Sequence, residues 1–285
     1  MTTLIESLVA NIGFFERALI EAVLAGALAG LVGTLVVLRK RAFFTTALTH
    51  ATFPGAMVAA VLGFSVVLGS ALFSVLLVAL MTAIARLRGQ GAQIAAGVVL
   101  TFGFALGAIL QAANPSLPIS VESFLVGSIL TVDWADIGLT AAVLVVAIVV
   151  LAVRARHIIF ATVDELGYRA AGYRAWVAEA ITVALIAATV VAIMPAIGAI
   201  LAIALVVGPA AAARLLVSST TGVFILAPAI GACAAVLGVI LSREFAVSAG
   251  GAITLVVAGL VALAVIARRL IAVRWRRDET QYLAT

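Results

Sequence analysis

The sequence predicts an all-α membrane protein, a polytopic transmembrane helical bundle with about eight or nine spans, on three observations. First, 66% of the 285 residues are hydrophobic and only 10% are charged, whereas soluble domains carry about one quarter charged residues. Second, the apolar residues gather in charge-free runs close to the roughly 20 residues that a helix needs to cross a bilayer. Third, the few cations cluster between alternate runs, as expected of loops on one side of a membrane.

Nine runs meet the length and charge criteria, and we expect spans at 18–38, 47–65, 68–85, 93–112, 137–153, 177–194, 196–213, 222–241 and 250–267. Glycine and proline interrupt 47–65 and 196–213, so these two runs could instead be re-entrant. Gly26 and Gly30 form a small-xxx-small pair in the first span, which is typical of close helix packing. We expect one transmembrane domain over residues 1–285, because no repeat or linker divides the chain.

The distribution of lysine and arginine predicts the orientation. If 18–38 crosses from outside to inside, 15 of the 17 cations fall on the inside, and only Arg17 and Arg243 fall outside. The segment 1–17 is then extracytoplasmic, and 268–285 is a cytosolic tail. The cations therefore mark topology, and the net charge of +5 does not indicate a nucleic-acid partner.

Several kinds of chemistry are excluded by the residues that the chain lacks. Lys40 is the only lysine and stands between two arginines, so the chain has no phosphate-binding loop of the Gly-Lys-Ser/Thr type. The two histidines, His50 and His157, are too far apart for a zinc-protease motif, and Cys233 is the single cysteine. We therefore expect no enzyme here, and any nucleotide hydrolysis must belong to another chain.

The polar residues within the spans centre on His50. A continuous helix from the cationic cluster at 39–41 would place His50 about 13 Å into the bilayer. Thr46 lies four residues earlier on the same helical face, Thr49 is adjacent, and the Pro-Gly pair at 54–55 would free backbone carbonyls one turn on. Imidazole is a ready ligand for zinc or manganese, whereas a hydrogen-bonded core histidine is the alternative on spacing alone.

Three segments between the spans offer surfaces to partners. The inside stretches 154–176 and 209–221 are suited to contact with a soluble protein, although 154–176 could equally be a solvated loop. The outside stretch 114–136 carries acids that could dock a cation-delivering protein or merely solvate the loop. Within the first span, Glu21 is expected to pair with Arg17 at i, i+4 spacing.

Five blocks of the sequence, in chain order, resemble the ABC-3 permeases of bacterial zinc and manganese ABC importers. They are VLRKR at 37–41 followed by ALTHATFPG at 47–55, FALGAIL at 104–110, GSILTVD at 127–133, DELGYRAAG at 164–172, and IGAILAIALVVGPAAAARLL at 197–216. The last block is the most specific, and the resemblance covers nearly the whole chain. The alternatives are a permease for a siderophore or cobalamin-type chelate and a passive metal channel.

The resemblance implies a homodimeric pore in the bacterial cytoplasmic (inner) membrane, two cytosolic ABC ATPase subunits and an extracytoplasmic metal-binding protein. It implies transported Zn²⁺ or Mn²⁺ and no permanent cofactor. The implied translocation pathway residues are His50, Thr46, Thr49, Pro54 and Gly55, with His50 the transient metal ligand. The implied ATPase-coupling residues are Pro209, Ala210, Ala213, Arg214, Leu215, Asp164 and Gly172.

Two positions depart from the family pattern. Thr46 stands where the family has an aspartate, and Ala92-Gln93 replaces the acidic pair that opens its fourth span. Both changes remove carboxylates, which are the hard oxygen ligands that suit manganese best, and so they favour zinc before manganese. They could equally mean a weaker transit site that relies on the binding protein for selectivity.

Overall fold

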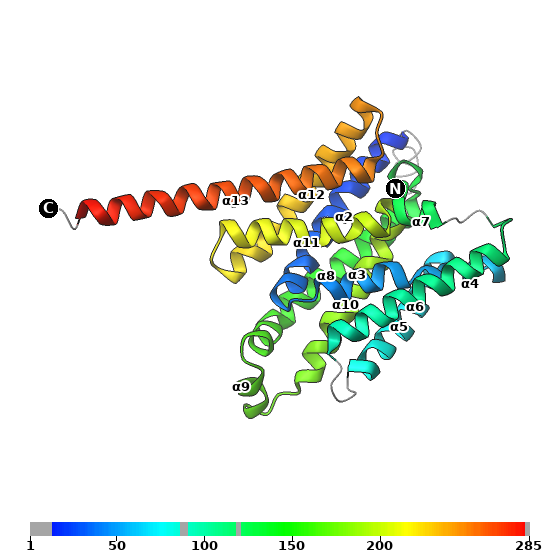
Figure 1. Cartoon of the computed structure of the whole chain (residues 1–285), viewed down its shortest axis with the longest axis horizontal. Helices are drawn as coiled ribbons and strands as arrows, with labels where there is room; N and C mark the ends of the chain where they lie inside the picture. The colour runs from blue at the N-terminus through cyan, green and yellow to red at the C-terminus, as the bar shows by residue number, and fades with distance from the viewer. Residues whose placement is uncertain (1–12, 86–90, 118–120, 283–285) are drawn as a thin grey trace, which may run out of the picture.

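The computed structural model describes residues 13–85, 91–117 and 121–282, and its long elements are helices (Figure 1). They are α2 (Phe14–Leu38), α3 (Ala42–Ala51), α4 (Phe53–Leu62), α5 (Val66–Ala85), α6 (Ala92–Ala113), α7 (Val121–Val126), the 3-10 turn η1 (Ile129–Thr131), α8 (Trp134–Val163), α9 (Glu165–Ala170), α10 (Ala175–Ile197), α11 (Ala199–Leu216), α12 (Thr220–Phe245) and α13 (Ala249–Tyr282). Within these residues, nine helical segments are long and apolar enough to span a membrane, which confirms the predicted fold class.

Two predicted features fall partly outside the described residues. Of the expected extracytoplasmic segment 1–17, the part up to residue 12 is not described, and neither are Arg86 and Arg88 of the inside cation set. The expected tail from residue 268 continues as helix α13 to Tyr282, and this helix projects beyond the rest of the bundle (Figure 1).

The second span begins at Ala42 rather than at residue 47, because the hydroxyls of the threonines in its first turns form hydrogen bonds within the helix. The hydroxyls of Thr45 and Thr46 donate to the backbone carbonyls of Arg41 and Ala42, four residues earlier, each at 3.1 Å. A hydroxyl bonded in this way places no unsatisfied polar group in the membrane. Residues 42–46, which the predicted span 47–65 left out, therefore belong to the helix.

The second span bends at Thr52, where α3 ends and α4 begins. Pro54 lies in the first turn of α4, has no N–H to continue the ladder and crowds the carbonyl four residues before it. The two helices together form a bent segment of 21 residues that is apolar enough to span.

The predicted spans 177–194 and 196–213 place a break at Pro195, but the junction between α10 and α11 lies at Gly198. Pro195 sits within the last turn of α10, where a missing N–H removes only one bond. Gly198 instead has φ of 83°, a conformation that a residue with a side chain rarely adopts. A Cβ there would also lie 2.3 Å from the carbonyl carbon of Val126, so the close approach of α7 requires glycine.

Small residues let α2 pack deep in the bundle, where it contacts α11, α12, α8 and α10. A Cβ added to Gly26 would lie 2.4 Å from the carbonyl oxygen of Gly231 on α12, and one added to Gly30 would lie 2.3 Å from that of Ala227. Gly33 meets the backbone of Val206 on α11 in the same way. Such backbone contact maximises van der Waals packing where lipid supplies no hydrophobic drive between helices.

Glu21 does not pair with Arg17 as its spacing predicts. Its side chain is fully buried and accepts a hydrogen bond of 2.8 Å from Thr140 Oγ1 on α8. The guanidinium of Arg17 instead lies over the ring of Phe14, 4.8 Å from its centroid. The glutamate points between α2 and α8, so a contact between helices replaces the expected contact within one helix.

The α2–α12 contact predicts that the effect of a Gly→Ala substitution on stability depends strongly on its position. Gly26→Ala should lower the free energy of unfolding by about 1–3 kcal/mol, because overpacking forces backbone to move. Gly259→Ala on α13 is the matched control, since nothing lies within 4 Å of a Cβ there. Thermal unfolding of both variants in detergent measures the effect, and equal melting temperatures would contradict this packing.

Candidate translocation site

His50 lies on a partly exposed face of α3. Phe43, Thr46 and His50 follow one another at helical spacing, and each keeps part of its surface accessible. Thr49, beside His50 in sequence, is fully buried. The structure therefore brings Thr46 and His50 together on one face, as the sequence predicts, and turns Thr49 inward.

The hydrogen bonds of His50 assign its ring proton. Nδ1 lies 3.0 Å from the carbonyl oxygen of Thr46 and 3.1 Å from Thr49 Oγ1. Because a carbonyl oxygen can only accept, Nδ1 carries the proton and donates it. Thr49 Oγ1 in turn donates to the same carbonyl at 2.8 Å. The Nε2 lone pair is then the one available for a ligand, which is the arrangement that metal-binding histidines use.

Phe104 on α6 is a neighbour of His50 that sequence reasoning did not assign to the site. Its ring meets the imidazole edge to face, with centroids 6.4 Å apart. The approach of α6 depends on Gly103, where a Cβ would lie 2.7 Å from that of Ala51 on α3. The FALGAIL block contains Phe104, but no local pattern indicates a contact across 54 positions of sequence.

Pro54 and Gly55 are buried by packing within the chain. A Cβ on Gly55 would lie 2.5 Å from the carbonyl oxygen of Gly69 on α5. The visible contribution of this pair is the bend of the second span and the tight α4–α5 contact, and its place in a pathway stays a prediction.

The donor set around His50 is sparse. Among the described residues, no three His, Cys, Asp or Glu side chains gather in a way that could hold a metal ion. Thr46 offers a neutral hydroxyl whose proton is already given to Ala42 O, and Gln93 is exposed at the start of α6. One imidazole and one hydroxyl form a weak site for a cation within a single chain.

Glu179 on α10 joins two arginines at the start of α3. Arg39 Nη1 lies 2.6 Å from Glu179 Oε2, and Arg41 Nη2 lies 2.5 Å from Oε1. The side chain of Arg39 is only 9% exposed, and it also donates to Thr162 Oγ1 at 2.9 Å and to Ile158 O at 3.3 Å on α8. Burial lowers the pKa of Arg39, and the charge of Glu179 opposes that shift. This cluster ties the base of the His50 helix to α8 and α10.

The predicted coupling segment beginning at Asp164 lies beside this ion-pair cluster. Asp164 caps α9 by accepting from the backbone N–H of Gly167 at 2.7 Å, and Gly172 ends the turn with φ of 83°. Arg169 and Glu165 line one cavity together with Arg39, Arg41 and Glu179. Helix α9 therefore lies next to the ion pairs that fix the start of α3.

The second predicted coupling region, at the end of α11, divides into buried and exposed residues. Pro209, Ala210 and Ala213 are buried, and the two alanines pack against Val223 and Ala227 of α12. Arg214 is exposed and Leu215 is partly exposed. A partner protein could reach only the last two of these five residues directly, while the others fix the helix end.

The fold and site define a multi-pass helical membrane protein with a lone, oriented imidazole on one accessible helix face. The family described as the ABC 3 transport family matches residues 11–268. Among similar proteins, the manganese import system permease protein ScaB of Streptococcus gordonii is 30% identical over 244 residues, covering 85% of this chain and 87% of ScaB. The manganese transport system membrane protein MntC of Halalkalibacterium halodurans is 26% identical over 251 residues, covering 88% and 86%.

A solved structure agrees. PsaBC from Streptococcus pneumoniae in complex with Fab superimposes with a TM-score of 0.81 at 28% identity, covering 93% of this chain and 95% of that chain. This chain belongs to the ABC 3 transport family. It is a membrane-spanning ABC transporter permease subunit and not an enzyme.

The ion-pair cluster predicts energetic coupling between distant positions. Arg39→Gln and Glu179→Gln, made singly and together, should show an interaction free energy of about 1–3 kcal/mol, because Glu179 and the nearly buried Arg39 are in direct contact. The control cycle uses Arg169 and Glu165, an exposed i, i+4 pair, and should give much less. Denaturant unfolding in detergent measures both cycles, and additive losses for Arg39 and Glu179 would refute the coupling.

Proposed function

We propose that this chain is the permease of an ATP-driven importer for divalent transition metal ions, working as a homodimer with cytosolic ABC ATPase subunits and an extracytoplasmic metal-binding protein. The observation that carries the proposal is His50, whose Nδ1–H is held by Thr46 O so that Nε2 is free on an accessible face of a membrane-spanning helix. Membership of the ABC 3 transport family supports its role as the membrane-spanning subunit of an ATP-driven transporter.

The cargo is argued from two sides. The names of ScaB and MntC support manganese. The donor chemistry around His50 supports zinc before manganese, because an imidazole without a neighbouring carboxylate suits the softer ion. Two protomers would supply two imidazoles, and we place zinc first and manganese second as the transported ion.

The orientation and the coupling contacts complete the proposal. The cations at 39–41, 154–174 and 214 are assigned to the cytosol by the positive-inside rule, and the chain's N-terminus to the outside. Arg214 and Leu215 are the residues proposed to touch the ATPase, with Pro209, Ala210 and Ala213 holding the end of α11. The segment from Asp164 to Gly172 is the second contact, and it would act on α3 through Glu179.

Replacing His50 with Ala should abolish metal uptake while the complex still co-purifies with its ATPase, since the side chain is partly exposed and its loss leaves the helix intact. The measurement is uptake of radiolabelled zinc and manganese into vesicles that contain all three components. His157→Phe is the control, because it removes the other imidazole while keeping an aromatic ring beside Tyr173. Unaltered uptake by the His50 variant would refute the assignment of His50 to the translocation pathway.

Restoring a carboxylate at position 46 should change selectivity. In competition assays, wild-type vesicles should take up zinc in preference to manganese. Thr46→Asp should raise manganese uptake relative to zinc by roughly tenfold or more, since even indirect changes around a ligand alter metal affinity by that factor. Thr46→Asn, of equal size but neutral, should not. A wild-type preference for manganese would overturn the order of cargo and leave the importer assignment standing.

A further inference from the structure

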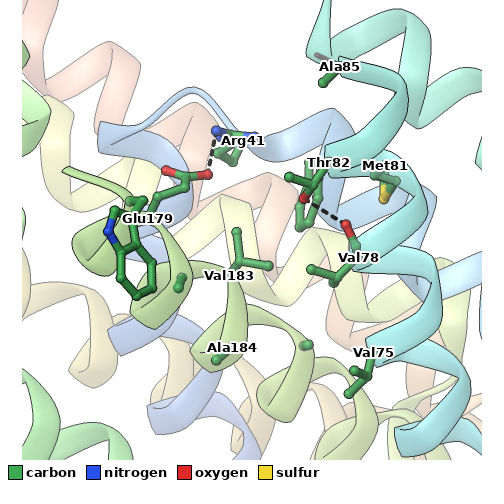
Figure 2. A pocket seen from close by; sticks show the side chains of 13 residues that line it. Arg41, Val75, Val78, Met81, Thr82, Ala85, Glu179, Val183 and Ala184 are labelled. Carbon is green, nitrogen blue, oxygen red and sulfur yellow. Dashed lines mark hydrogen bonds and ion pairs between the residues drawn. The ribbon is translucent and has the colours of Figure 1, made fainter. Parts of the chain in front are cut away.

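A large cavity outside the His50 face lies between α5 and α10. Its volume is about 490 Å³, and apolar side chains make up most of its wall. Figure 2 shows Val75 and Val78 of α5 opposite Val183 and Ala184 of α10, with the Arg41–Glu179 pair at one end. The α5 residues of the wall extend from Val75 to Ala85, which is about 15 Å along the helix axis.

The cavity is accessible from the side of the bundle. Val75 is 67% exposed and Trp176 is 64% exposed, and Thr82 and Ala184 also keep exposed surface. An apolar slot that opens sideways between two membrane-spanning helices faces lipid tails, because the hydrocarbon core is the solvent at that depth.

A second cavity of about 250 Å³ adjoins the first and is polar. It shares Arg41, Trp176 and Glu179 with the apolar cavity and is otherwise lined by Arg39, Glu165, Arg169 and two alanines. Three arginines face two glutamates there, so the lining carries one excess positive charge. The two cavities form one amphipathic site. The larger cavity is an apolar slot, and the smaller cavity is a cationic chamber at the end of the slot that contains Arg41 and Glu179.

We propose that this site, the lipid slot, binds one anionic phospholipid, with an acyl chain between α5 and α10 and the phosphodiester among Arg39, Arg41 and Arg169. A phosphodiester carries the single negative charge that the chamber lacks, and arginine hydrogen-bonds phosphate oxygens in a bidentate manner. Basic pockets between membrane helices bind such headgroups, and a tryptophan at the rim suits the interface. That the leaflet is the cytosolic one rests on the orientation given under the proposed function.

Occupancy of the lipid slot has a consequence for the transporter. The headgroup would share Arg41 with Glu179, and the chain would fill the space that α5 and α10 otherwise leave open. The bound lipid therefore braces the same cluster that fixes the base of the His50 helix.

Brominated lipids test the proposal directly, because bromine quenches a nearby indole. The complete transporter complex is placed in nanodiscs, and the Trp176 signal is the difference between the wild-type complex and its Trp176→Phe variant. Phosphatidylglycerol with brominated chains should quench this signal with about fivefold preference over brominated phosphatidylcholine at equal mole fraction. A preference of this size is expected when one unpaired arginine attracts an anionic headgroup. The assay uses neither metal nor ATP, so its failure is distinct from a failure of the proposed function.

Two pairs of variants separate the parts of the site. Ala184→Phe fills the slot and should remove the preference, whereas Ala142→Phe, at an exposed alanine of α8 outside the lining, should keep it. Arg169→Gln cancels the excess charge and should reduce the preference to near one, whereas Arg174→Gln, an exposed neighbour outside the lining, should not. Equal quenching by both lipids in the wild type, or a preference that survives both Ala184→Phe and Arg169→Gln, would overturn the lipid slot.

Discussion

The double ion pair at Glu179 is the interaction on which the functional parts of the molecule depend. One carboxylate on α10 holds both Arg39 and Arg41, and Arg39 reaches onward to α8 through Thr162 and Ile158. The turn from α2 into α3 is therefore fixed by contacts more than 100 positions away in sequence. Since α3 carries His50, the polar cluster at Glu179 also fixes the position of the imidazole. The cluster lies at the edge of the membrane, where ion pairs are tolerated far better than at its centre.

Helix packing sets the frame within which that cluster acts. Where α2 meets α12, Gly26 and Gly231 bring backbone against backbone, and no side chain of any size fits between them. Between α5 and α10 the contacts are looser, which leaves the cavity beside Arg41. The bundle thus combines close backbone packing between α2 and α12 with a cavity between α5 and α10. Arg41 and Glu179 line that cavity.

Sequence predicted what depends on local composition and failed where distant contacts decide. Charge-free runs located the nine spans found in the described part of the chain, because the bilayer imposes similar length and polarity on every span. The start of the second span was misplaced, since the back-bonding of Thr45 and Thr46 makes polar residues acceptable in a helix. Spacing placed Thr46 beside His50, but it paired Glu21 with Arg17 instead of Thr140 and gave no sign of Phe104. Both misses are contacts between helices, which local periodicity cannot encode.

The chemistry at His50 indicates where selectivity resides in the proposed importer. A conducting site must release its ion as readily as it accepts it, so strong coordination would block transit. Thr46 contributes no charge, and its proton is committed to Ala42 O, which leaves His50 Nε2 as the main donor from each chain. So weak a donor set can pass a desolvated cation and gives only a modest preference for zinc over manganese. On the proposed function, discrimination between metals must therefore be made mainly before the ion enters the membrane, by the protein that delivers it.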